Sequence, residues 1–407
     1  MDLSPRSPWG HSQATGQVSS DPIGAWPKAP SQYCPLSRST GTTLLLDEEI
    51  TVTNTAHVNG LRIVVGVDTH KDEHVAVAVD GIGIRLGECR VQTTPDGYIR
   101  LERWATGIGY VTAFGVEGTG SYGAGLARLL SGLGHQVIEV SRPDRSTRRR
   151  LGKSDSIDAE AAARSVLSGV AQGLPKSGTH GVEMIRVLKV AKDSAIRAKT
   201  QAGNQMLALV VTAPASLRWA LDGLSVIRLA KRCAGLRPGD VSTPTAATKL
   251  ALRSIARRHN HLTSEIKIIN VELARLTAET APALVAAFCI GTDIAATLLI
   301  TAGDNPQRLK SESAFAALCG VNPIPASSGK TNRHRLNRGG DRRANSALHR
   351  VVIVRLRHET RTREYMVRRR KEGMTKKEAI RYLKRYVARE VFTILKQLGR
   401  QQLAHAA

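Results

Sequence analysis

Aromatic residues are scarce in this chain, since Phe, Trp and Tyr together make up only 4% of its 407 residues. Platforms of stacked aromatic rings for single-stranded nucleic acid are therefore not expected to dominate its surface. The cysteines are also few and far apart, and no Cys-x-x-Cys pair occurs among Cys34, Cys89, Cys233, Cys289 and Cys319. Neither a zinc site nor a disulfide framework is indicated, and a reducing cytoplasm suits the chain.

Long hydrophobic runs are missing as well. No apolar stretch approaches the roughly 18 residues that a membrane-spanning helix needs. The N-terminal residues lack the basic start and apolar stretch of a secretory signal. We therefore expect a soluble, cytoplasmic protein without a membrane partner.

Acidic residues are too few to balance the basic ones. The chain has 59 Lys and Arg residues against 34 Asp and Glu residues, a net charge of +25. Such a surface attracts polyanions and releases their counterions on contact. The excess is concentrated between Thr331 and Arg400, although a solvated helical face could explain part of it. Nucleic acid is therefore the first expected partner, and binding to DNA would associate the chain with the nucleoid.

The pattern of residues divides the chain into four parts. Residues 1–60 are rich in Ser, Pro, Gly and Thr without periodicity, so we expect a disordered extension. Residues 61–172 predict an α/β domain, residues 173–281 a helical segment and residues 282–400 a second, mostly helical domain. In the α/β part we predict strands over 62–68, 74–80, 84–93, 110–117 and 136–140, and helices over 95–105, 122–133 and 156–167.

The order of these elements indicates a fold. Three successive strands followed by alternating helices and strands match a ribonuclease H-like (resolvase-like) arrangement better than a doubly wound sheet. The helical segment contains a possible coiled-coil seam with apolar spacings of 4, 3, 4 and 3 over two heptads. So short a seam fits packing against a neighbouring helix as well as dimerisation. Its residues are Leu262, Ile266, Ile269, Leu273 and Leu276.

Four acids stand where this fold would bring them together. Asp68 ends the first predicted strand and Glu117 the fourth, and these strands would be neighbours with their carboxyl ends on one side. Asp155 and Asp158 are three apart at a helix start, which places both on one face. Converging carboxylates bind Mg²⁺ or Mn²⁺, and a metal pair can activate an attacking oxygen and stabilise a leaving one.

Each acid also has a purely structural explanation. Asp68 could begin a turn, Asp155 could be an N-cap, and Asp158 could be a favourable first-turn acid. The set as a whole favours a metal site for phosphodiester cleavage. The Gly-rich turn Gly118-Thr-Gly-Ser-Tyr-Gly123 could instead cradle a phosphate, as such turns do in actin-like ATPases and sugar kinases.

A second region with possible chemistry is the basic loop Pro323-Ile-Pro-Ala-Ser-Ser-Gly-Lys330. A serine beside a glycine in such a loop can contact phosphate, or attack phosphorus where guanidinium groups stabilise the developing charge. A flexible loop without a function is the alternative. We expect the cations on and after the loop to contact nucleic acid, namely Lys330, Arg333, Arg335, Arg338, Arg342 and Arg343.

Taken together, these motifs resemble those of the insertion-sequence transposases with an Asp-Glu-Asp-Asp (DEDD) catalytic set, the type guided by a bridge RNA. The resemblance runs from about Arg62 to Leu398. It rests on Gly66-Val-Asp68-Thr-His-Lys71, Val116-Glu117-Gly-Thr-Gly-Ser-Tyr122, Lys153-Ser-Asp155-Ser-Ile-Asp158, Gly320-Val-Asn-Pro323 with Ser328-Gly329, and Arg335-Leu-Asn-Arg-Gly-Gly340.

The resemblance implies a composite active site in a DNA transposase or serine recombinase. Asp68, Glu117, Asp155 and Asp158 would hold the metal, while Ser328, or the adjacent Ser327, would form a covalent link to DNA. It further implies a guide (bridge) RNA and a homo-oligomer, a dimer or tetramer, with subunit contacts in the coiled-coil segment. A metal-dependent junction-resolving nuclease, an actin-like ATPase or kinase, and a DNA-binding protein with a decayed site remain the alternatives.

Overall fold

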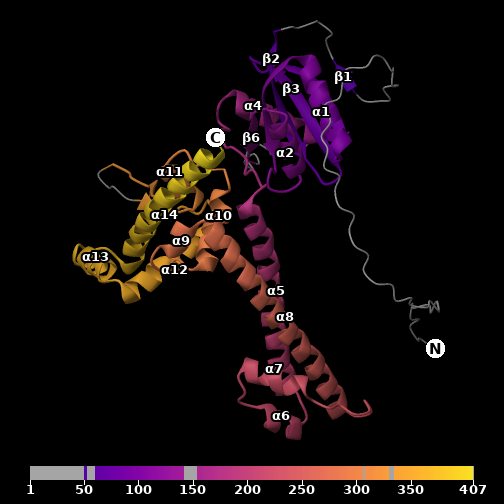
Figure 1. Cartoon of the computed structure of the whole chain (residues 1–407), viewed down its shortest axis with the longest axis vertical. Coiled ribbons are helices and arrows are strands. Elements are labelled where there is room, and N and C mark those ends of the chain that lie inside the picture. Colours follow the sequence, from indigo (N-terminus) through magenta and orange to yellow (C-terminus); the bar gives the residue numbers. More distant parts are fainter. Residues whose placement is uncertain (1–49, 53–59, 142–153, 306–307, 330–333, 407) are drawn as a thin grey trace, which may run out of the picture. The chain divides into compact units, whose positions relative to one another are not determined.

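The computed structural model describes residues 50–52, 60–141, 154–305, 308–329 and 334–406 (Figure 1). A six-stranded mixed sheet has the order β1-β4-β3-β2-β5-β6. Strands β2, β3 and β4 form an antiparallel meander, because short turns reverse the chain, whereas β5 and β6 run parallel to β2 after helical crossovers. The strands are β1 (Ile50–Val52), β2 (Arg62–Thr69), β3 (Glu73–Asp80), β4 (Arg85–Gln92), β5 (Tyr110–Glu117) and β6 (Val137–Val140).

Helices cover both faces of this sheet. Alternate residues of β2 point to opposite faces, so Ile63, Val65 and Val67 share a core with α1 (Pro95–Ile108) and α2 (Ala124–Gly132). On the other face Val64 and three valines of β3 pack against α4 (Asp155–Leu167). The two buried faces explain why the strands read as nearly continuous apolar runs.

The close approach of α4 to β2 depends on Gly66. A Cβ at this position would lie 2.0 Å from the Ala159 carbonyl oxygen and 2.3 Å from the Ala163 backbone nitrogen. These contacts are with backbone atoms, which cannot move aside as a flexible side chain can. The absence of a side chain therefore lets the first turns of α4 lie directly against the central strand.

Two long helices follow the sheet. α5 (Gly181–Val211) and α8 (Pro244–Thr280) run antiparallel. Gly181 at the start of α5 lies against Thr280 at the end of α8, and Arg258 donates a hydrogen bond to Gln205 at 2.9 Å. Figure 1 shows them side by side, with α6 (Ala215–Leu221) and α7 (Val226–Ala234) at one end of the pair. The helix pair is formed within one chain.

The predicted seam of α8 takes part in packing within the chain. Leu273 and Leu276 are buried in the core of the C-terminal helices, whereas Leu262, Ile266 and Ile269 are partly buried. Packing against neighbouring helices, one of the two alternatives, therefore accounts for the buried residues of this repeat.

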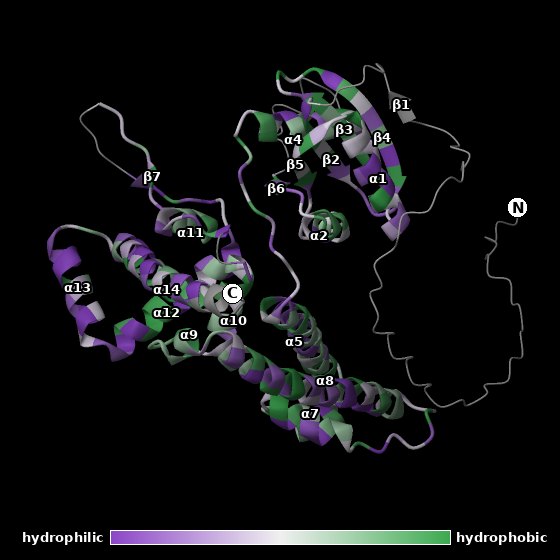
Figure 2. Cartoon of the chain, turned by 45° about the horizontal axis from the view of Figure 1, so that its top comes forward, coloured by the Kyte–Doolittle hydropathy of each residue, from purple (hydrophilic) through white to green (hydrophobic). Residues whose placement is uncertain are grey.

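The C-terminal region is mostly helical, and a small hairpin interrupts it. Its core joins Phe315, Val351 and Val391 with the apolar residues of α10 (Thr292–Ala302). Figure 2 colours most of α13 (Thr360–Lys371) as hydrophilic, in keeping with its many arginines. The elements are α9 (Pro282–Ala286), α10 (Thr292–Ala302), α11 (Glu312–Leu318), β7 (Ile324–Pro325), β8 (His334–Arg335), α12 (Arg342–His358), α13 (Thr360–Lys371) and α14 (Lys376–Ala406).

The predicted strands and helices between residues 61 and 167 are all present, with bounds that differ by at most three residues. Ile50–Val52, which lies within the extension expected to be disordered, forms β1 and pairs antiparallel with β4. An exposed sheet edge offers backbone donors and acceptors to a short strand whatever its side-chain pattern. The rest of residues 1–59 lies outside the described residues. None of the described helices is long and apolar enough to cross a membrane.

A cluster of charges ties α5 to α10 and α12. Asp293, in the first turn of α10, lies 3.0 Å from Lys189 Nζ, 2.9 Å from Lys192 Nζ and 3.3 Å from an Arg350 guanidinium nitrogen. Burial alone would raise the pKa of Asp293, but the hydrogen bonds from Lys192 and Lys189 outweigh it and lower the pKa to about 2. The ionised carboxylate therefore stabilises the fold.

We expect Asp293→Asn to lower the free energy of unfolding by about 1–2 kcal/mol near pH 7, since solvent screens this half-buried group in part. Because the folded-state pKa is depressed, this stabilisation is present above the ordinary pKa of 3.8 and is lost as the pH falls through about 2. Urea unfolding near pH 7 and in acid measures both effects. Asp96→Asn, which removes an exposed first-turn acid of α1, is the control. An equal decrease in its free energy of unfolding would mean that Asp293 acts through the helix dipole and not through its ion pairs.

Candidate active site

The ends of two neighbouring strands bring Asp68 and Glu117 to the same edge of the sheet. In the parallel register of β2 and β5, Val67 pairs with Val116, so the two acids occupy adjacent positions one residue further on. The Thr69 hydroxyl donates a hydrogen bond to the Glu117 carbonyl oxygen at 3.0 Å and joins the strand ends. Both acids are buried, with 7% and 4% of their surface exposed.

The N-terminus of α4 supplies the other two acids. Ser154 is the N-cap, and its hydroxyl accepts a hydrogen bond from the Ile157 backbone N–H at 3.3 Å. The capping role considered for Asp155 is therefore taken by its neighbour. Asp155 and Asp158 lie in the first turn, and Asp158 is buried although Asp155 is partly exposed.

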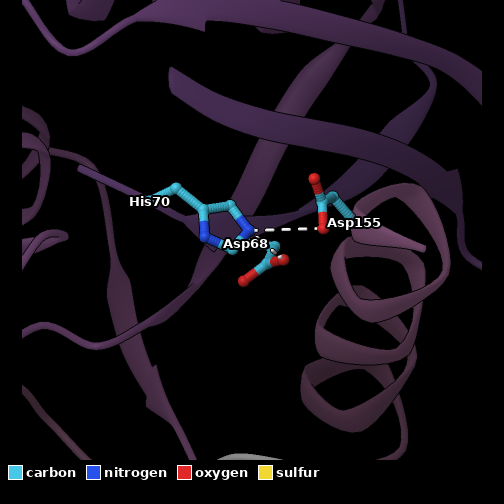
Figure 3. Close-up of side chains that lie close together, drawn as sticks. All are labelled: Asp68, His70 and Asp155. Carbon is cyan, nitrogen blue, oxygen red and sulfur yellow. Dashed lines mark hydrogen bonds and ion pairs between the residues drawn. The ribbon is translucent and has the colours of Figure 1, made fainter. Parts of the chain in front are cut away.

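His70 connects the strand edge with the helix (Figure 3). Its Nε2 lies 3.1 Å from an Asp68 carboxylate oxygen and 3.3 Å from an Asp155 carboxylate oxygen. One ligand atom of each of these three residues lies within 4.8 Å of those of the other two. His70 was not among the predicted site residues. Its position two residues after Asp68, where the strand ends, was the one local signal.

The electrostatics of this cluster favour a cation. Burial raises the pKa of Asp68, attraction to His70 lowers it, and repulsion from Asp158 and Asp155 raises it further, with a net upward shift. Several carboxylates lie close together and repel one another, and a bound divalent ion would relieve this repulsion. Two carboxylates and an imidazole, with further acids beside them, are a donor set that fits such an ion.

The serine loop lies in the helical C-terminal region. β7 and β8 pair antiparallel, with Ile324 opposite Arg335 and Pro325 opposite His334, and the loop between them carries Ser328. Ser328 is exposed, and the following Gly329 adopts a positive φ of 52°. A residue with a side chain rarely adopts this conformation, so the glycine permits the turn after the serine.

The cations predicted to bind nucleic acid differ in their surroundings. Arg335, Arg338, Arg342 and Arg343 are all exposed, but Arg343 also lies 3.2 Å from Asp193, with which it forms an ion pair. Lys330 and Arg333 lie outside the described residues. Asp341, just before Arg342, is the N-cap of α12 and accepts hydrogen bonds from the Arg343 and Ala344 backbone N–H groups.

Comparison with known proteins shows which enzymes the chain resembles. Residues 65–213 match a DEDD model described as "Transposase", and residues 283–367 match the "Transposase IS116/IS110/IS902 family". The transposase for insertion sequence element IS1328 of Yersinia enterocolitica is 29% identical over 241 residues, which cover 58% of this chain and 69% of that protein. Neither the junction-resolving nuclease nor the ATPase is favoured by these similarities. The chain is therefore similar to insertion-sequence transposases of the IS110 type over both matched segments, and it is a transposase, an enzyme that cleaves DNA strands and transfers them.

Proposed function

We propose that this transposase cuts and rejoins DNA with a divalent metal held by Asp68, Glu117, Asp155 and Asp158. The observation that carries the proposal is the convergence of Asp68, His70 and Asp155, with Asp158 close enough to raise the pKa of Asp68. The strand order, with α4 pressed against β2, supports a ribonuclease H-like fold for this part of the chain.

The residues of the cluster would have different roles in catalysis. Bound Mg²⁺ or Mn²⁺ would activate the attacking oxygen and stabilise the leaving one. Asp68 and Glu117 are fixed by neighbouring strands, and Asp155 and Asp158 by the first turn of one helix, so the carboxylates are held before DNA arrives. The His70 imidazole lies within 3.3 Å of a carboxylate oxygen of both Asp68 and Asp155, and this contact would hold the two acids at a set separation.

The second part of the proposal is that Ser328 is the nucleophile. Its Oγ would lose a proton and form a bond to phosphorus, while the bond from phosphorus to the leaving sugar oxygen breaks and that oxygen takes up a proton. The phosphoserine link keeps the energy of the phosphodiester, so a hydroxyl of another strand can rejoin by the reverse step without ATP. The exposure of Ser328 and the exposed Arg335 and Arg338 nearby in sequence support this role.

We also infer that the chain works as a homo-oligomer, a dimer or tetramer, with a guide (bridge) RNA. Exposed apolar side chains on the long helix pair support subunit contacts, since Val187, Val190, Ile268 and Val271 are each 48–68% exposed. The net charge of +25 supports binding to nucleic acid, of which a guide RNA would be one example. We expect contacts with the RNA to be distributed over the basic helices.

Metal removal tests the proposed function. We expect the purified chain, with donor DNA, target DNA and guide RNA, to exchange strands in Mg²⁺ or Mn²⁺ and to stop in EDTA while still binding DNA. Electrophoresis of the products and of the bound complex measures the two activities separately. Strand exchange at an unchanged rate in EDTA would contradict a carboxylate-held metal.

A further inference from the structure

Three cations are buried in the described part of the chain: Lys189, Arg355 and Lys384, which are 8–9% exposed. Lys189 lies 3.0 Å from Asp293, and Arg355 makes a double hydrogen bond to the Glu390 carboxylate at 2.7 and 2.9 Å. Lys384 alone of the three has no carboxylate partner among the described residues. Its positive charge is therefore buried without compensation.

The one polar contact of Lys384 within the described residues is with a neutral amide. Lys384 Nζ donates a hydrogen bond to Asn345 Oδ1 at 2.8 Å. Asn345 Nδ2 donates to the carbonyl oxygens of Cys319 and Gly320, at 3.1 and 2.8 Å, which fixes the orientation of its amide. Burial lowers the pKa of Lys384, and repulsion from Arg381 lowers it further. Burying an ammonium group without a nearby anion costs free energy. We therefore expect an anion to bind beside Lys384.

Lys384 lies in the wall of a cavity. The cavity has a volume of about 930 Å³, and Arg335 and Arg381 add further positive charge to its lining. Glu372 and Glu378 also line it, and Arg381 lies 3.7 Å from Glu378, so the positive charge that no described carboxylate offsets is that of Lys384 and Arg335. Met374 and Tyr382 provide apolar surface in the same wall, and the Tyr382 residue is 40% exposed. A site with cations on one part and an aromatic ring on another fits a molecule that has a phosphate and a flat base.

The walls of this cavity are held in place by backbone contacts. A Cβ on Gly340 would lie 2.6 Å from the Gly320 nitrogen and 2.7 Å from the Leu318 carbonyl oxygen, so the two segments meet backbone to backbone. Asn337 donates a hydrogen bond to Asn322 Oδ1 at 2.5 Å across the same two segments. The glycines and asparagines of the two C-terminal motifs therefore build a preformed site.

We propose that this cavity binds one nucleotide of a DNA strand, with its phosphate at Lys384 and Arg335 and its base against Tyr382. The choice of DNA rests on the proposed function, because the hairpin that carries the serine loop adjoins the cavity: Pro323, just before β7, and Arg335 of β8 both line it. Ser328 follows Pro325 by three residues, a span of about 10 Å when extended. The bound nucleotide would position the strand for the serine.

Equilibrium binding tests this proposal. Fluorescence anisotropy with the full chain in EDTA, and a labelled single-stranded DNA of about 12 nucleotides, measures binding without cleavage. We expect Lys384→Met to weaken binding by about 10- to 100-fold, the loss of a charged hydrogen bond. Lys377→Met, which removes an exposed lysine from the same helix, should change it by no more than about threefold. Unchanged DNA binding by Lys384→Met would overturn the proposal.

Two further measurements separate this site from a structural lysine. Removing a buried, uncompensated charge should leave the melting temperature unchanged or raise it, whereas a structural lysine would lower it. Tyr382→Ala is a second variant at an exposed ring, and we expect it to weaken binding by about tenfold. Equal binding by Tyr382→Ala, or thermal stabilisation by inorganic phosphate equal to that by dTMP, would overturn the contact with the base.

The probes also identify the strand. If Lys384→Met lost binding to RNA of the same sequence but bound DNA as the wild type does, the assignment of the site to DNA would be overturned. Because the measurement needs neither metal nor the serine, Ser328→Ala should bind the labelled DNA as the wild type does. A failure of the proposed catalysis would leave this result unaffected, so the two proposals fail separately.

Discussion

Asp68→Asn is expected to reduce DNA cleavage by more than about 100-fold, since changes to groups that merely orient metal ligands already cost 10- to 100-fold. The substitution keeps the shape of the side chain but removes its charge from the centre of the cluster. Burial and repulsion raise the pKa of Asp68, so its ionised form opposes folding rather than favouring it. We therefore expect the melting temperature of the metal-free protein to stay the same or rise.

The expected loss of cleavage without a loss of thermal stability distinguishes a metal ligand from a residue that only stabilises the fold. Cleavage assays and thermal unfolding without metal measure them, and DNA binding should be largely intact. Asp72→Asn, at an exposed acid in the turn after β2, is the control and should cleave normally. If Asp68→Asn lost both activity and stability, the carboxylate would belong to the framework of the fold instead of the metal site.

Ser328→Ala is expected to abolish the covalent protein–DNA adduct and strand exchange altogether. The alanine has no oxygen to bond to phosphorus, whereas the carboxylate cluster is untouched. Labelled DNA that stays with the protein after denaturation measures the adduct. Ser327→Ala is the matched control, because it removes the same group one position earlier and should still form the adduct.

Other outcomes of this experiment assign the chemistry differently. An adduct that disappears in Ser327→Ala and persists in Ser328→Ala would move the nucleophile by one residue. Metal-dependent cleavage by the wild type without any adduct would contradict a serine nucleophile, and would match a nuclease that activates water with its carboxylates.

Local patterns in the sequence were enough to predict the sheet and its helices. The run from Ile63 to Val67 and the alternation in residues 74–80 are properties of neighbouring residues, which short-range periodicity records. Asp68 and Glu117 could be placed at one edge because parallel strands align their carboxyl ends. β1 could not be predicted, since the edge of β4 and not its own pattern causes it to pair.

The remaining features depend on contacts between distant segments. His70 faces Asp155 across 85 positions of sequence only because α4 lies on the sheet. Arg343 is paired with Asp193 of α5, which no nearby pattern indicates. Lys384 reads as one more exposed cation on a basic helix, and its burial arises from packing against the ends of α11 and α12. Burial of a charge is decided by the partner surface, which the local sequence does not contain.

The missing side chain of Gly66 has a consequence for the chemistry itself. Asp68 lies two residues beyond it on β2, while Asp155 and Asp158 lie in the helix that rests on it. The distance between α4 and β2 at Gly66 therefore sets the separation between Asp68 on the strand and the two acids on the helix. One added methyl group would push α4 outward as a unit and widen the gap between ligands without altering any of them. The geometry of the proposed metal site thus depends on a glycine that is not one of its ligands.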